Sequence, residues 1–422
     1  MNPCVHIRSF LVILIMTLSS PADARDLWTS DAGDSSLKFN TSLVGMGLVS
    51  APTQHPLPEE RGITGSLFGD MRLEAIYRIN KEIQLDVAYD NRLTWSSGTS
   101  SGITAALPSN SSGPYRIRQL SGVVAQSRDF VDYNELDRAS FNFQTKTINL
   151  TIGRQAVGWG RGTIFSAIDI FAPFTPLEIN REWRRGVDAA RADIKISNTA
   201  SIDMVTAWGP SLDQSALGLR LRGYAGPIDA EVVFAKRATD YMYGVTSSAA
   251  IGDLEMHGEF AVFQTPDDVP SPGLFGNPSL VPKAVLGISN NFNIGTGLKV
   301  LMEYHYSGFG ASDPKLLPSL LATPSYSKRI QRGDTQILGR QVLAGQVAYT
   351  FNERWNGSFE VLQSLTDSSG VLLPSLSWDF SERMSLQGAL FYGYGTTPEM
   401  GVPQSQFGGV PLTFILKMSF YD

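Results

Sequence analysis

The sequence predicts an all-β fold: a closed antiparallel transmembrane β-barrel of about eighteen strands, with a long loop folded into the lumen. Three observations predict it. They are an exported leader, long strands in which apolar and charged side chains alternate, and connections that are alternately tight and long. Strand length separates this fold from a soluble β-sandwich, whose strands average about five or six residues.

Residues 1–24 have the pattern of a secretory signal peptide. Arg8 gives a positive start, residues 10–18 are apolar, and Ala22-Asp23-Ala24 supplies the small residues of a cleavage site. The apolar run is too short to span a bilayer, and no later run approaches the roughly eighteen residues of a membrane helix. Cys4 lies in this leader, so residues 25–422, the predicted barrel domain, contain no cysteine.

Composition narrows the class of protein. The formal net charge of −6 argues against a nucleic-acid partner. Forty glycines, 10% aromatic residues and 42% hydrophobic residues suit many half-buried strands joined by turns. An exported chain of this kind is either an outer-membrane barrel or a soluble periplasmic β-protein.

The first long strand pair favours the barrel. One face carries Leu67, Met71, Leu73, Ala75, Tyr77 and Ile79, and the other carries Asp70, Arg72, Glu74 and Arg78. After a turn at Asn80-Lys81, residues 83–92 repeat the pattern. Such strands run about twelve residues with mixed charges along the whole polar face, as a wall between lipid and a wet lumen requires.

The same alternation predicts eighteen strands: 36–50, 66–79, 82–95, 135–145, 147–156, 187–197, 200–209, 214–225, 227–238, 241–251, 254–264, 282–290, 295–307, 337–350, 354–365, 370–380, 383–394 and 411–421. Tight turns follow the even-numbered strands, and longer loops follow most odd-numbered ones. Since short turns of bacterial outer-membrane barrels face the periplasm, we expect both termini there.

The last strand predicts how the chain reaches its membrane. Phe414, Leu416, Met418 and Phe420 alternate with Lys417 and Ser419. This strand resembles the C-terminal assembly signal of bacterial outer-membrane barrels, although Asp422 follows the aromatic pair Phe420-Tyr421. The expected partners are therefore the outer-membrane bilayer and its assembly machinery, and the oligomeric state is not indicated.

Residues 157–186 form a connection too long and too aromatic for an ordinary surface loop. Its aromatic side chains are Trp159, Phe165, Phe171, Phe174 and Trp183. The charged residues in and beside it are Arg154, Arg161, Asp169, Glu178, Arg181, Glu182, Arg184, Arg185, Asp188 and Arg191. We expect the aromatic residues to pack the loop against the inner wall and the charged residues to line a constriction.

These charges allow two interpretations. They can pair with one another and fix the loop to the wall, or some arginines can stay unpaired and attract carboxylate or phosphate solutes. In the second case, neutralising the loop arginines should remove an anion preference. Trp159 and Trp183 could also form a slide for sugar rings, although packing is the commoner role.

Arg154 conflicts with the strand pattern. It shares a face with Ile148 and Ile152, hence the lipid side, where a charge costs roughly 2–4 kcal/mol at mid-depth. Either a bulge at Gly153 turns Arg154 inward, or Arg154 lies near the rim.

The sequence carries no recognisable enzyme site. His55, His257 and His305 have no Ser or acid in a catalytic pattern, and no two of them have metal-ligand spacing. Residues 158–162 are glycine-rich but lack the Lys-Ser/Thr of a phosphate-binding loop. We therefore predict no enzyme, cofactor or metal site, with His257 and His305 as polar lumen residues.

Around the long loop the sequence resembles a family of outer-membrane porins. The segments are Gly153-Arg154-Gln155, Trp159-Gly160-Arg161-Gly162, and Arg185-Gly186-Val187-Asp188-Ala189 with Arg191. They are similar to alginate-export-type barrels. The resemblance covers about forty residues and implies an export or diffusion barrel, often of eighteen strands, with an arginine-bearing constriction. The insert at residues 169–174 departs from the alginate exporters themselves, so their substrate does not carry over.

These observations predict an outer-membrane channel for small polar or anionic solutes, saccharides included. The alternative is a non-conducting barrel that serves as a scaffold or sleeve for a partner protein. A third reading, an outer-membrane hydrolase, would need His257 or His305 beside a Ser or an acid.

Overall fold

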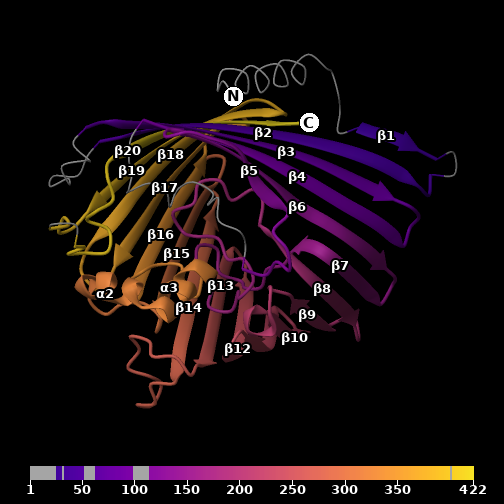
Figure 1. The fold of residues 1–422 in the computed structure, drawn as a ribbon. Coiled ribbons are helices and arrows are strands. Elements are labelled where there is room, and N and C mark those ends of the chain that lie inside the picture. The colour runs from indigo at the N-terminus through magenta and orange to yellow at the C-terminus, as the bar shows by residue number, and fades with distance from the viewer. Residues whose placement is uncertain (1–24, 31–32, 52–61, 98–113, 400–401) are drawn as a thin grey trace.

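The computed structural model describes residues 25–30, 33–51, 62–97, 114–399 and 402–422 (Figure 1). The predicted signal peptide lies outside the described residues. The strands are β1 (Arg25–Thr29), β2 (Ser36–Ser50), β3 (Thr64–Arg78), β4 (Ile83–Ser96), β5 (Ser121–Gln126), β6 (Phe130–Gln144), β7 (Ile148–Ala156), β8 (Gly186–Lys195), β9 (Ala200–Ala207), β10 (Ala216–Ala225), β11 (Ile228–Arg237), β12 (Asp240–Ile251), β13 (Leu254–Gln264), β14 (Leu280–Phe292), β15 (Leu298–Ser307), β16 (Gln341–Thr350), β17 (Trp355–Ser364), β18 (Gly370–Ser381), β19 (Met384–Tyr394) and β20 (Thr413–Tyr421).

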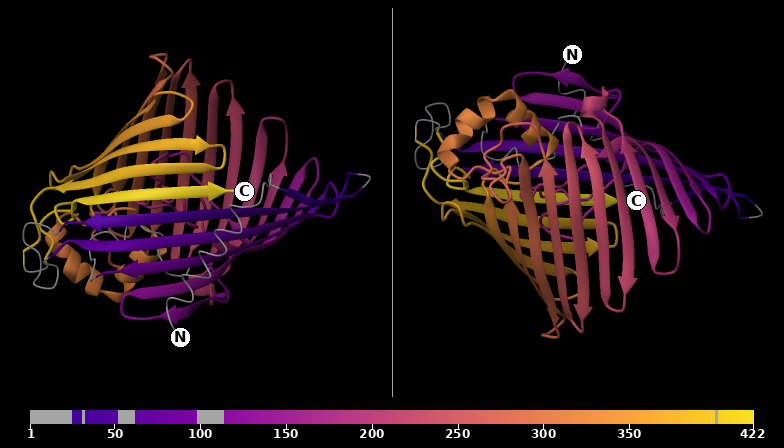
Figure 2. Two further views of the ribbon diagram at one scale, coloured as in Figure 1. Left: turned by 90° about the horizontal axis from the view of Figure 1, so that it is seen from above. Right: turned by 90° about the horizontal axis from the view of Figure 1, so that it is seen from below.

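Eighteen of these strands form a closed antiparallel barrel. From β2 onward each strand pairs with the next, except that β4 pairs with β6, and β20 returns to β2. Figure 2 shows the yellow last strand lying beside the indigo β2. The predicted all-β closed barrel is confirmed, and each predicted strand has its counterpart in the ring.

The alternation predicted from the sequence sets which side chains face outward. In β11 the apolar residues Ile228, Val232 and Phe234 are exposed on the outer face, whereas the charged residues Glu231 and Arg237 are buried inside. This is the reverse of a soluble sheet. It is stable when lipid covers the outer face and polar side chains meet inside, because lipid offers no hydrogen bonds to charged groups.

The two ends of the barrel differ in their connections. One end, which we call the turn side, has short links such as residues 226–227 and 252–253. The other end, the loop side, carries the described residues 114–120, 157–185, 265–279, 308–340, 395–399 and 402–412. On the loop side, residues 238–239 are a short exception, with Ala238 at a positive φ of 53°. β2 starts and β20 ends at the turn side, because Ser42 pairs with Tyr421.

Three features were not predicted from the sequence. β1 pairs with the first residues of β2, beyond the point where β20 ends. β5 pairs with residues 131–135 of β6, whereas β7 pairs with residues 139–144 of the same strand. β5 therefore continues the wall where β7 leaves it. The third feature is a helical segment in the loop at 308–340.

That helical segment contains η3 (Pro314–Leu316), α2 (Leu317–Ala322) and α3 (Pro324–Arg332), at the loop side (Figures 1 and 2). Arg329 of α3 reaches the strand ends by donating to Asp240 at 2.6 and 2.9 Å and to Asp267 at 2.6 Å. Burial alone would raise the pKa of Asp334, but Arg237, Arg332 and Arg329 outweigh it and lower this pKa to about 2. Among the described residues, no helix is long and apolar enough to cross a membrane.

Candidate functional site: the lumen loop and its arginine face

The lumen loop, residues 157–185, follows β7, and the strand bends at Gly153 just before the loop begins. Gly153 has a φ of +116°, and a Cβ there would lie 2.2 Å from the carbonyl oxygen of Ala139. The pairing register of β7 with β6 and β8 continues through Gly153 without a shift, so the predicted bulge is wrong. The strand bends by a backbone angle that glycine adopts freely, and no extra residue is inserted.

Arg154 follows this bend and does not project into lipid. Its guanidinium group pairs with Asp188 at 2.7 and 3.1 Å, and it also donates to the carbonyl oxygens of Leu136 and Arg118 at 2.9 and 2.8 Å. The side chain is buried, two positions before the loop-side end of β7. The conflict with strand parity is thus resolved near the rim, where the 114–118 segment, β6 and β8 surround the charge.

Gly153→Ala should destabilise the folded barrel, since the alanine needs a left-handed backbone and its Cβ meets a wall carbonyl. We expect a loss of about 1–3 kcal/mol in the free energy of unfolding. Denaturant unfolding of the refolded protein in detergent micelles measures it. Gly223→Ala is the matched control, because a Cβ at that strand glycine meets no atom within 4 Å. Equal midpoints for the two variants would contradict the role of Gly153.

The first half of the lumen loop is held by Glu259 on the inner wall. One carboxylate oxygen accepts from the backbone N–H groups of Arg161 and Gly162, the latter at 2.9 Å. The other oxygen accepts from the Ser166 hydroxyl at 2.9 Å and from the Ala167 N–H at 2.6 Å. A single buried carboxylate on β13 therefore satisfies several backbone donors of the loop.

Glu303 on β15 holds the residues between these two points. Its oxygens accept from the backbone N–H groups of Thr163 at 2.5 Å, Ile164 at 2.9 Å and Phe165 at 3.1 Å. His257 also bonds Glu303, at 2.8 Å. This His–acid contact meets one requirement of the hydrolase reading. The carboxylate is occupied by the loop backbone, however, and no Ser hydroxyl bonds His257 among the described residues.

The aromatic residues of the loop have different environments. Trp159, Phe165 and Phe171 are buried, whereas Trp183 is 41% exposed and lies under the guanidinium group of Arg72 at 4.7 Å. The Trp159 indole donates to Asp203 at 3.1 Å. The six-membered ring of its indole lies close to a glycine, since a Cβ at Gly218 would come within 2.4 Å of it. Trp159 is therefore a packing residue and is closed to a passing sugar ring.

The charged residues of the second half of the loop are mostly paired. Arg184 bonds Asp169 and lies over Phe174, and Glu182 bonds Lys417 of β20. Burial raises the pKa of Asp169, which Arg184 and the Phe171 N–H partly offset. Burial also raises the pKa of Glu178 and lowers that of Arg185. Within the part of the chain that the structure describes, Arg181 bonds only the carbonyl oxygens of Glu178 and Pro176.

A second group of arginines lines the wall beside the loop, and we call it the arginine face: Arg161, Arg191, Arg220 and Arg222. Its partners are Asp203, Asp229 and Glu231. Arg191 and Arg220 share Asp203, with bonds of 2.9 and 2.7 Å. Arg161 bonds Asp229 and Glu231, and Arg222 bonds Glu231 at 2.8 Å.

Some arginines of the arginine face are partly exposed, whereas most of their carboxylate partners are buried. The side chains of Arg191 and Arg222 are each 28% exposed, whereas those of Asp203 and Glu231 are 3% and 1% exposed. Arg161 is 19% exposed, and Asp229 14%. The side chains of Arg191 and Arg222 are thus much more exposed than the carboxylates that they bond. These four arginines are all paired with carboxylates, as the first interpretation expected of the loop charges, and Arg161, Arg191 and Arg222 remain partly exposed.

Strand alternation in the sequence puts Glu259, Glu303, Asp229 and Glu231 on the lumen face, but it does not indicate what they bind. Strand alternation gives the face of a residue, and it does not give which wall strand the loop reaches. Asp203, Arg220, Arg222 and Lys417 were not singled out as site residues, although the same alternation puts them inside.

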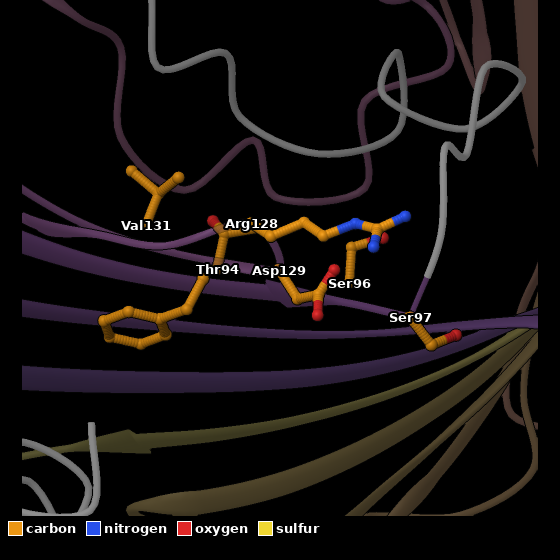
Figure 3. Close-up of a pocket in the computed structure, with 7 residues that line it drawn as sticks. Thr94, Ser96, Ser97, Arg128, Asp129 and Val131 are labelled. Atoms are coloured by element: carbon orange, nitrogen blue, oxygen red, sulfur yellow. The ribbon is translucent and has the colours of Figure 1, made fainter. Parts of the chain in front are cut away.

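Two further kinds of candidate site would be a metal-binding group and a pocket apart from this site. No group of three His, Cys, Asp or Glu residues able to hold a metal ion occurs among the described residues. A pocket of about 470 Å³ lies at the loop side near β4 and the β5–β6 turn (Figure 3), and it is lined by Thr94, Ser96, Ser97, Arg128, Asp129, Phe130 and Val131. None of the predicted site residues lines this pocket.

Comparison with known proteins gives the fold of the chain a context. No family model and no curated protein matches the sequence. The crystal structure of Acinetobacter baumannii OccAB4 matches with a TM-score of 0.53 at 9% identity, covering 93% of this chain and 100% of that chain. Pseudomonas aeruginosa OccK5 (OpdH) matches with 0.52 at 7% identity, covering 91% and 97%, and P. aeruginosa OccD3 (OpdP) with 0.51 at 8% identity, covering 96% and 95%. At these identities the likeness concerns the fold alone, and the chain therefore has the closed, porin-like β-barrel fold of outer-membrane proteins.

Proposed function

We propose that the chain forms an outer-membrane channel for small polar solutes, with anions preferred and with the lumen loop as its constriction. The observation that carries the proposal is the arginine face, where partly exposed arginine side chains bond nearly buried carboxylates beside that loop. Forked guanidinium groups bind carboxylate and phosphate oxygens in pairs. Electrostatic interactions in a narrow, water-poor passage are weakly screened, so these charges act strongly on a passing ion.

The orientation follows from the connections. The turn side faces the periplasm, so both termini lie there and the loop side faces outward. β20, ending in Phe420-Tyr421, is the strand that the outer-membrane assembly machinery would recognise. Saccharides are a further solute class, because Trp183 is an exposed aromatic ring of the loop against which a sugar ring can stack.

One observation favours the second candidate, a non-conducting scaffold. Buried apolar side chains of the loop, among them Ile164, Phe165, Ile168 and Phe171, pack against apolar residues of the inner wall. If this packing closes the lumen, the barrel serves a partner protein and passes no solute.

Single-channel recording in planar bilayers decides between these candidates. The purified barrel should show stepwise conductance. In a KCl gradient, its reversal potential should have the sign of a chloride-preferring pore. Inserted protein without conductance steps would favour the scaffold, and a cation-preferring pore would contradict the role given to the arginine face.

A further inference from the structure

His305 and Ser307, whose side chains have no hydrogen-bond partner among the described residues, lie beside Lys283 on the inner wall behind the lumen loop. Lys283 of β14 lies directly opposite Ser307 of β15 in the strand pairing, and His305 precedes Ser307 by two residues on the same face. Lys283 is 1% exposed, and His305 and Ser307 are 0% exposed. Phe165 of the loop stacks on the His305 ring with centroids 4.7 Å apart and closes the group from the lumen.

The hydrogen-bonding capacity of this group is unused. Neither ring nitrogen of His305 nor the hydroxyl of Ser307 has a partner among the described residues. The Lys283 ammonium group lies 5.9 Å from the ring of Phe263, and no carboxylate of the described chain lies within 4 Å of it. Buried polar groups are nearly always hydrogen-bonded, and a buried ammonium without a counter-ion is costly.

The acidic side chains near Lys283 form hydrogen bonds with other groups. The carboxylates whose charge reaches Lys283 are those of Asp334, Glu259 and Asp169. Asp334 bonds Arg329 and Arg332, Glu259 bonds the loop backbone, and Asp169 bonds Arg184.

A second cation adds to the positive field. Arg237 lies over the same Phe263 ring that Lys283 approaches, with its guanidinium carbon 4.7 Å from the centroid. Arg237 is paired with Asp334, whereas the ammonium group of Lys283 has no carboxylate partner within the described chain.

We propose that Lys283, Ser307 and His305 form a buried binding site for a monatomic halide anion, chloride in the cell. The ammonium group, the hydroxyl and one ring N–H are three donors that one small anion can accept at once. A carboxylate or phosphate solute is excluded, because the group is closed to the lumen by Phe165 and lies next to Phe263. The halide is then a resident counter-ion of the wall and is distinct from the solutes that cross the lumen.

The test uses bromide as the probe. The refolded full-length barrel is crystallised in NaBr, and anomalous diffraction at the bromine edge should show a peak between Lys283 Nζ and Ser307 Oγ. In Lys283→Met this peak should vanish, whereas Lys315→Met, which alters an exposed lysine at the loop side, should retain it. A water molecule in place of the peak, or bromide only at other positions, would overturn the proposal.

A solution measurement covers the case in which Lys283→Met does not fold. The melting temperature of the wild-type barrel in detergent should rise when gluconate, which is too large for the closed site, is replaced by bromide at constant ionic strength. Ser307→Ala removes one donor without adding bulk and should weaken the bromide affinity by about ten-fold. Equal bromide dependence in wild type and Ser307→Ala would exclude the site, whether or not the barrel conducts.

Discussion

Replacing Glu259 and Glu303 together by glutamine is expected to release residues 161–168 from the wall and to widen the channel. Each carboxylate holds several backbone N–H groups of the loop. A glutamine of the same size keeps one acceptor oxygen and presents an NH₂ group to the remaining amides, which cannot donate to it. Since a hydrogen bond to a charged group contributes about 1.5–3 kcal/mol, losing several of them removes the main polar anchor of this segment.

The variant should show a larger single-channel conductance and a noisier open state than wild type. Hydrogen–deuterium exchange should show faster exchange at the amides of residues 161–168, with the strand amides unchanged. Glu255→Gln is the matched control, since Glu255 lies on the same strand as Glu259 but, among the described residues, accepts only from the Ser289 hydroxyl at 3.2 Å. If the loop amides stay protected from exchange in the double variant, Glu259 and Glu303 do not hold the loop. This outcome can be measured even if the barrel does not conduct.

Neutralising the exposed arginines of the arginine face should reverse the ion preference of the channel. Arg161, Arg191 and Arg222 replaced by glutamine would leave one arginine against three carboxylates, where wild type has four against three. The lumen surface beside the loop then changes from positive to negative. A change of about 1.4 kcal/mol in the barrier for an ion alters its permeability ten-fold, so the reversal potential in a KCl gradient should change sign.

The loop arginines expected from the sequence to set the anion preference were Arg161, Arg181, Arg184 and Arg185, and the present variant replaces only Arg161 of that set. Arg184 belonged to that set, but its removal would leave the buried Asp169 unpaired and would disturb the loop itself. The control replaces Arg161, Arg191 and Arg222 by lysine, which keeps the charge and loses the planar fork. Chloride preference should survive in the lysine variant. Anion preference that persists in the glutamine variant would contradict the role of the arginine face in ion selectivity.

The sequence determined the wall of this barrel. The repeat of two residues in a strand is a local property, so the face of Glu231 or Phe234 can be read from its immediate neighbours. Tight turns between long strands likewise determine that consecutive strands pair. These local signals gave the number of strands in the ring, their order, and the lumen position of Glu259 and Glu303.

Only the tertiary structure decided how the loop is held and what a solute meets. Gly162 bonds Glu259 and Ile164 bonds Glu303, contacts that span 97 and 139 positions in the chain. No local pattern encodes such a pair, because closure of the ring and the bend at Gly153 set the distance between them. The same holds for the arginine face. The sequence supplies seven charges that nearly cancel, and only their packing leaves the Arg191 and Arg222 side chains partly exposed over the nearly buried Asp203 and Glu231.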